Sequence, residues 1–136
     1  LQSGAAAERF GRMVAALGGP ADFVDRWRDR LPAAPVVRDV VADRRGFVAT
    51  IDGRALGEAV VRLGGGRLVA GQRIDPSVGL SDLAALGDEV APGDRIARIH
   101  AASEEAAKAA SVAVAAAYGI GVDFPDLPPV TYRSVP

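Results

Sequence analysis

The 136-residue chain contains no cysteine, one histidine and one lysine, and only 5% of its residues are aromatic. Without cysteine it can form no disulfide, no thiolate zinc site, no iron–sulfur cluster and no cysteine nucleophile. Fifteen arginines carry almost all of the basic charge, and acids balance them to a formal net charge of −1. That balance gives no overall field to attract nucleic acid or an anionic membrane. We therefore expect no nucleic-acid partner and no membrane partner.

Long apolar runs are also lacking. The best candidate is the alanine-rich stretch 106–117, which is too short to span a membrane and is interrupted by Lys108 and Ser111. With no secretion signal either, we expect a cytoplasmic protein. The chain begins without methionine and enters a helical pattern almost at once, which leads us to expect a fragment. Its length suits one compact domain, or one domain and a stub of another.

Two helical patterns precede a pair of prolines. The first has Ser3 available as N-cap and ends at the glycine-rich segment 18–20, and its apolar positions are Ala6, Phe10, Met13, Val14 and Leu17. The second has Pro20 in its first turn, and its apolar side holds Phe23, Val24, Trp27 and Leu31. Pro32 and Pro35 then bracket two alanines. We place a linker there and predict two parts, a helical stub over 1–35 and a domain over 36–136.

The remainder alternates between strands and helices. Two β-branched segments, 36–41 and 47–51, are separated by the turn-like segment 43–46, which predicts a hairpin. Asp52 is the expected N-cap of a helix ended by the glycines 64–66. Short strands and turns are expected over 68–101, a helix from Ser103 to about Tyr118, and a last strand over 120–124. This order predicts the α+β class, and no internal repeat is evident.

Two segments hold residue types found in active or anion-binding sites. Glycines 64–66 followed by Arg67 have the composition of a phosphate cradle, but they follow a helix, whereas a P-loop follows a strand. A helix stop with close backbone packing is the favoured interpretation. His100 is the only histidine, with no cysteine or second histidine to complete a metal site. We predict a structural hydrogen bond for it.

Hydroxyl and carboxylate side chains in 75–94 fit no catalytic pattern. Ser77 has Gly79 after it but Asp75 before it, so it lacks the glycine pair of a nucleophile elbow, and Ser81 flanks the same turn. A carboxylate pair or a Mg²⁺ or Ca²⁺ site would draw on five acids, which are Asp75, Asp82, Asp88, Glu89 and Asp94. Their spacing fits no calcium loop, so turn capping is the simpler prediction.

The segment 87–97 resembles the turn of biotinyl and lipoyl carrier domains. Such a carrier presents a lysine at a hairpin tip, whereas Lys108 falls within a predicted helix. We therefore expect no prosthetic group and no cofactor.

Several segments, in order, resemble the thymidine and pyrimidine-nucleoside phosphorylases. Residues 3–10, 13–14 and 18–20 are similar to the helix that ends the family's α/β domain. The segments similar to its C-terminal domain are 54–57, 63–67, 74–75, 78–79 and 87–101, and residues 131–133 resemble its tail. Residues 15–24 look closer to thymidine phosphorylases than to the broader enzymes.

The resemblance implies an α/β-hammerhead fold, which is a mixed sheet with a barrel-sandwich-like hairpin. It also implies a homodimeric parent enzyme that converts thymidine and inorganic phosphate to thymine and 2-deoxy-α-D-ribose 1-phosphate. In that family the residues that hold nucleoside and phosphate lie upstream, and no position here matches them. We therefore assign no catalytic, substrate-binding, cofactor-binding or metal residue, and expect the isolated chain to be inactive.

Two other interpretations stay open at this point. The chain could be a free-standing hammerhead module that binds a partner or a small ligand without catalysis. In that case residues 36–136 should cover the apolar faces of the first two helices, which a severed fragment would leave exposed. The third possibility is a small enzyme built on His100, which requires a pocket with a carboxylate near that ring.

Overall fold

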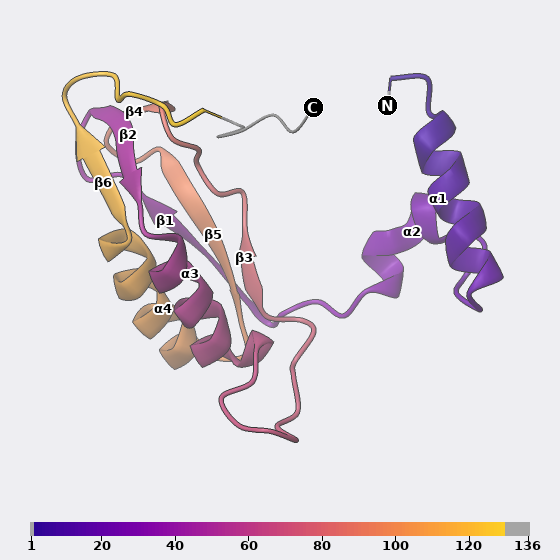
Figure 1. Cartoon of the computed structure of the whole chain (residues 1–136). Coiled ribbons are helices and arrows are strands. Elements are labelled where there is room, and N and C mark those ends of the chain that lie inside the picture. The colour runs from indigo at the N-terminus through magenta and orange to yellow at the C-terminus, as the bar shows by residue number, and fades with distance from the viewer. Residues whose placement is uncertain (1, 130–136) are drawn as a thin grey trace, which may run out of the picture. The chain divides into compact units, whose positions relative to one another are not determined.

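The structure is a computed structural model that describes residues 2–129. It divides into two compact units, with the division between Pro32 and Ala33 (Figure 1). Residues 131–133, whose sequence resembles the tail of the phosphorylase family, lie outside the described residues.

The N-terminal unit is a pair of helices, α1 (Ala5–Ala16) and α2 (Phe23–Arg30). The predicted first residue was wrong for both helices. Gly4, at a φ of 75°, precedes α1 and no side chain caps it, because the chain turns in the left-handed region that glycine favours. Pro20 lies before α2, whose N-cap position is Asp22. Asp22 instead accepts two hydrogen bonds from Arg30, at 2.9 and 2.7 Å, across the solvent side of the helix.

The two helices do not bury their apolar side chains against each other. The Phe10 and Phe23 rings meet edge to face at 6.1 Å between centroids, and yet neither helix contains a buried residue. In this unit Phe10 is 46% exposed and Trp27 42% exposed. By itself the pair therefore has an apolar face and no core.

The larger unit contains two three-stranded antiparallel sheets and two helices. One sheet has the order β1-β5-β3 and the other β4-β2-β6. The strands are β1 (Val36–Val41), β2 (Gly46–Ile51), β3 (Gly79–Ser81), β4 (Glu89–Val90), β5 (Arg95–Ala101) and β6 (Tyr118–Gly121). Mixed helix and sheet confirms the predicted α+β class. The last strand lies earlier than the predicted 120–124.

The predicted hairpin between β1 and β2 was wrong. Instead, β1 pairs with β5, whose partner residues lie 54 to 65 positions later, and β2 pairs with β4, whose partner residues lie 42 to 44 positions later. Backbone hydrogen bonds of Ala42 with Gly93 and Asp94, and of Val48 with Gly87 and Asp88, extend the same antiparallel register. Residues 36–48 and 87–101 therefore form one bent ribbon that crosses from the first sheet into the second. The segment 43–46 turns the ribbon between sheets and does not reverse it.

Helices α3 (Gly53–Val60) and α4 (Glu104–Ala116) begin where the sequence predicts. The Asp52 side chain accepts from the Ala55 amide at 2.9 Å, and the Ser103 side chain accepts from the Ala106 amide at 3.2 Å. Each cap satisfies an amide that the first turn leaves without a partner. After α3 the chain widens into a π-helical turn, η1 (Val61–Gly65), which ends at the glycines as predicted.

The core lies between the sheets and the two helices, which lie side by side (Figure 1). Val48, Ile99 and Val114 are the largest fully buried side chains. Small residues fill much of the rest, since Ala97 of β5 and Ala107 of α4 are fully buried. Such side chains let a helix approach a sheet closely, at the cost of less apolar area per residue. No helix in the described part of the chain has the length and apolarity needed to cross a membrane.

Candidate functional site

The glycine run 64–66 is a packed helix end and not an anion cradle. Gly64 has a φ of 101°, and its carbonyl accepts a hydrogen bond from the Asp75 amide at 2.9 Å. A Cβ at Gly65 would lie 2.9 Å from the Val60 side chain, and a Cβ at Gly66 would lie 2.6 Å from that of Val61. The glycines thus let the chain fold back on its own helix, which confirms the helix-stop interpretation.

His100 lies on β5 and makes a structural contact with the neighbouring strand. Its Nε2 is 2.9 Å from the Oγ of Ser81, with both residues half-buried. Within the described residues, no group of three His, Cys, Asp or Glu side chains is placed to hold a metal ion. Ser81 is thus accounted for together with His100, and the pair joins β3 to β5. This confirms the predicted structural hydrogen bond.

Asp88 and Asp94 cap two turns of the same design. Each aspartate Oδ2 accepts from the amide three residues earlier, that of Ala85 or Ala91, at 2.8 Å. Each turn also has a glycine with positive φ, Gly87 at 87° or Gly93 at 92°. Turn capping is thus confirmed for these two acids.

The two turns belong to a six-residue repeat that our interpretation of the sequence missed. Residues 85–90 read Ala-Leu-Gly-Asp-Glu-Val and residues 91–96 read Ala-Pro-Gly-Asp-Arg-Ile. In each copy the glycine amide donates to a ribbon carbonyl, and the aspartate carbonyl accepts from the same ribbon residue, either Val48 or Ala42. The expectation of no internal repeat was therefore wrong. The signal was present in the Ala-x-Gly-Asp spacing, and its role is to hold the bent ribbon.

The other three acids are also engaged within the fold. Asp75 accepts from both the amide and the hydroxyl of Ser77, at 2.9 and 2.6 Å, and the hydroxyl hydrogen bond is the main cause that lowers the pKa of Asp75. Glu89 pairs with Arg45 at 2.8 Å. Asp82 lies 3.5 Å from Arg98. Turn capping holds for Asp75, whereas Asp82 and Glu89 form surface ion pairs.

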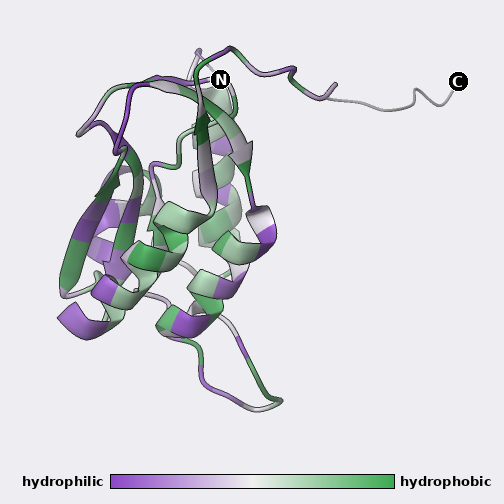
Figure 2. Cartoon of the chain, turned by 90° about the vertical axis from the view of Figure 1, so that its left-hand side faces the viewer, coloured by the Kyte–Doolittle hydropathy of each residue, from purple (hydrophilic) through white to green (hydrophobic). Residues whose placement is uncertain are grey.

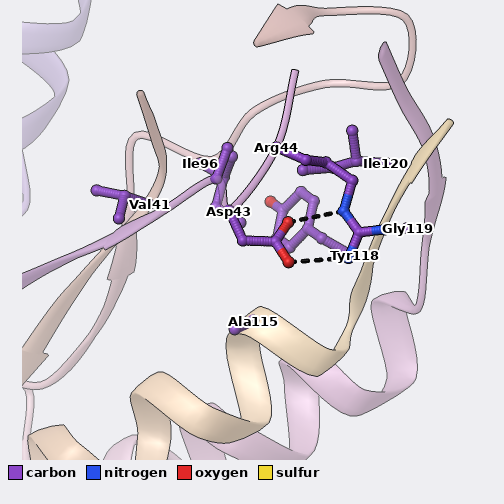
Figure 3. Close-up of a pocket in the computed structure, with 9 residues that line it drawn as sticks. Val41, Asp43, Arg44, Ile96, Ala115, Tyr118, Gly119 and Ile120 are labelled. Atoms are coloured by element: carbon purple, nitrogen blue, oxygen red, sulfur yellow. Dashed lines mark hydrogen bonds and ion pairs between the residues drawn. The ribbon is translucent and has the colours of Figure 1, made fainter. Parts of the chain in front are cut away.

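A hollow of 390 Å³ lies between the ribbon bend, the end of α4 and β6 (Figure 3). Its floor includes Ile96 and the ring of Tyr118, whose hydroxyl donates to the Ala84 carbonyl at 3.3 Å. Burial raises the pKa of that phenol. The hydroxyl is thus committed to the backbone and does not act as a free acid at the hollow.

Asp43 and Arg44 stand at the rim of this hollow and neutralise each other. The guanidinium donates to the carboxylate twice, at 2.9 and 2.8 Å (Figure 3). This hydrogen bonding lowers the pKa of Asp43 and raises the pKa of Arg44. A charged ligand would have to displace one of the two groups, so the pair is not a prepared binding site.

Lys108 lies exposed within α4, as predicted, and not at a hairpin tip. The described residues therefore bring together turn caps, ion pairs and one Ser–His contact, and no nucleophile with both a base and an orienting group.

A family model described as the pyrimidine nucleoside phosphorylase C-terminal domain matches residues 47–121. The match covers more than half of the chain and runs from β2 to the last residue of β6. It leaves out β1, although β1 forms the outer part of the ribbon with β5.

Proposed function

Because the chain belongs to the pyrimidine nucleoside phosphorylase C-terminal domain family, we propose that it is the C-terminal structural domain of a thymidine phosphorylase. The parent enzyme would convert thymidine and phosphate to thymine and 2-deoxy-α-D-ribose 1-phosphate. The observation that carries the proposal is the family match to 47–121. The catalytic and substrate-binding residues would lie in another part of the enzyme, with none in this chain.

The proposed domain division assigns 1–35 to the end of the phosphorylase α/β domain and 36–136 to an α/β-hammerhead. The helix pair supports this because α1 and α2, taken by themselves, contain no buried residue. Apolar side chains such as Phe10 and Trp27 need a partner surface to leave water. The bent ribbon shared by two sheets is the feature that supports the hammerhead assignment. The full-length enzyme would be a cytoplasmic homodimer.

In this proposal the domain supports the closure of the enzyme and takes no part in the chemistry. Phosphorolysis competes with hydrolysis, so a phosphorylase benefits when its domains close and exclude water from the reacting groups. A rigid module packed against the α/β domain would stiffen one side of that closure. The ribbon, fixed by two capped turns, gives the module such rigidity.

The first test is an assay of the purified chain with thymidine and phosphate, and with uridine and phosphate. We expect no thymine or uracil release above the uncatalysed rate, and the same result for the His100→Ala variant. Turnover by the wild-type chain at an ordinary enzymatic rate, with no longer species present, would contradict the proposal. Loss of that turnover in the variant would favour an enzyme built on His100.

The second test uses the parent phosphorylase, from which the counterpart of 36–136 is deleted. We expect the deletion variant to have a lower thermal midpoint of unfolding and a lower turnover than the intact enzyme. We expect the intact enzyme to prefer thymidine over uridine. Unchanged turnover and stability would argue against the structural role and would favour a free-standing binding module.

A further inference from the structure

The loop after η1, residues 66–78, extends beyond the helices and strands of its unit in both views (Figure 1 and Figure 2). Its outer stretch, residues 67–74, contains no buried residue, and all of its residues except Gln72 are exposed. Leu68 is 71% exposed and Val69 66% exposed. Opening this stretch therefore exposes little additional apolar surface to water.

The outer stretch takes no part in either sheet. The Leu68 amide donates to Gln72 Oε1 at 2.8 Å, and the Gln72 amide donates to the Val69 carbonyl at 3.3 Å. Both hydrogen bonds lie within the stretch itself. Beyond it, the Asp75 amide donates to the Gly64 carbonyl at 2.9 Å and closes the base of the loop. The stretch can thus open locally while the sheets and helices stay intact.

Two arginines, Arg67 and Arg73, stand near the ends of this exposed stretch. Within residues 33–129, the other basic residues outside helices and strands are Arg44 and Arg45, in the turn of the ribbon. Hydrogen bonds of the ribbon flank that turn closely, at residues 42 and 46. An endopeptidase binds several consecutive residues of its substrate in an extended conformation, so a cut at the turn would require the ribbon to open. A cut in the loop requires no such opening.

We propose that an arginine-specific serine endopeptidase cleaves this chain in the loop, at the Arg67–Leu68 bond, the Arg73–Ile74 bond or both. Such an enzyme recognises the guanidinium through an aspartate in its specificity pocket. Hydrolysis adds one water molecule across the peptide bond, which leaves a carboxylate on the arginine and an ammonium group on the next residue. This modification site is separate from the proposed phosphorylase role.

The larger unit should survive the cut as two associated pieces. The piece before the cut contributes β1, β2 and α3, and the piece after it contributes the other strands and α4. Because β1 pairs with β5, and β2 pairs with both β4 and β6, each sheet is joined across the cut. The core is shared as well, since Val48 from the first piece and Ile99 and Val114 from the second are fully buried. Each piece thus covers the apolar surface of the other.

The experiment is timed digestion of the full chain with trypsin, followed by mass spectrometry and native size-exclusion chromatography. The first cut within the larger unit should fall at Arg67 or Arg73, and the two pieces should elute together. Cuts within residues 1–32 are also expected, because neither helix there contains a buried residue, and fragment masses distinguish them. A first cut of the larger unit at Arg44 or Arg45, or pieces that elute separately, would overturn the proposal.

The thermal midpoint of the nicked complex gives a second readout. Its unfolding separates two chains, so its midpoint should rise with protein concentration more steeply than that of the intact chain. The same concentration dependence for both would contradict the two-piece description.

Matched variants and a second protease make the test specific. Arg67→Gln/Arg73→Gln should be cut in the loop at least about a hundredfold more slowly, because the specificity pocket loses its charged partner. The control Arg44→Gln/Arg45→Gln should be cut in the loop at the wild-type rate. A lysine-specific endopeptidase reports opening of the core instead, because Lys108 lies within α4.

Each protease is calibrated on an unstructured peptide that contains its own cleavage site. Relative to that peptide, the lysine-specific cut of the folded chain should be much slower than the tryptic cut of the loop. Equal relative rates would mean that both enzymes act on the globally unfolded chain, and the loop would then be no special site.

Discussion

At the scale of single residues, polar side chains form ion pairs with one another and complete the hydrogen bonding of turns and helix starts. Asp52 and Ser103 cap helices, and Asp88 and Asp94 cap turns. Each supplies an acceptor to an amide that regular structure leaves unpaired. The residue types that first suggest catalysis are therefore explained by turn caps, by the ion pairs of Asp82 and Glu89, and by the contact between His100 and Ser81.

The Ser103 cap gives a direct prediction. Replacing Ser103 with alanine should destabilise the larger unit by about 1 kcal/mol, because the Ala106 amide loses its acceptor. Ser111 is the matched control, since its hydroxyl donates to the Ala107 carbonyl, which remains bonded within the helix. Urea unfolding followed by circular dichroism measures both. Equal midpoints for Ser103→Ala and Ser111→Ala would contradict a capping role.

The ion pair of Asp39 with Arg98 should contribute to the loss of folding stability in acid. Hydrogen bonding from Arg98 lowers the pKa of Asp39 below its ordinary value of 3.8, with Arg95 adding to the effect. A carboxyl with a lowered pKa stabilises the fold above its unfolded-state pKa, and the stabilisation is lost as the pH falls through the folded-state pKa. The free energy of unfolding of the wild type should therefore fall more steeply below about pH 4 than that of Asp39→Asn.

The measurement for Asp39 is urea unfolding at several pH values between neutral and strongly acidic. Asp123→Asn serves as the control, because Asp123 is exposed and takes part in no ion pair among the described residues. Parallel profiles for the wild type and Asp39→Asn would show that the pair with Arg98 adds nothing to acid sensitivity.

At the scale of elements, a glycine is required at one position and is replaceable by alanine at another. Gly87 has a φ of 87°, and a Cβ there would lie 3.1 Å from the Phe124 ring, so Gly87→Ala should cost at least about 1–2 kcal/mol. Gly57 lies exposed within α3 with nothing within 4 Å of a Cβ, so Gly57→Ala should stabilise by about 0.4–1 kcal/mol. Thermal unfolding of the pair checks both signs. A stabilised Gly87→Ala variant would mean that the turn can adopt another conformation.

The sequence predicts the local elements well and the pairing of strands poorly. The caps at Asp52 and Ser103 and the stop at Gly64 depend on a few neighbouring residues, which the sequence displays directly. The partner of β1 is not the adjacent β2 but β5, 54 to 65 residues later, and no local feature of the sequence distinguishes these two pairings. The Ser81 contact of His100 depends on that long-range pairing. The sequence predicts that His100 makes a structural hydrogen bond, but it does not predict that the partner is Ser81.

At the scale of the whole molecule, the two units differ in how their backbone hydrogen bonds are protected. The larger unit surrounds its ribbon with a core in which Ile99 and Val114 are fully buried. The N-terminal unit contains helices of 12 and 8 residues without a buried residue. Isolated helices of that length are marginal in water, and most helix stability in proteins comes from packing an apolar face. The units should therefore open with different free energies.

Hydrogen–deuterium exchange of the chain should show this difference. Amides of α1 and α2 should exchange with little protection, while those of β5 and α4 should exchange at rates that reflect global unfolding of the larger unit. In a full-length phosphorylase the same α1 and α2 amides should become protected, because the proposed α/β domain would cover Phe10 and Trp27. Strong protection of α1 and α2 in the chain by itself would mean that the helices already have a partner surface, as a free-standing module requires.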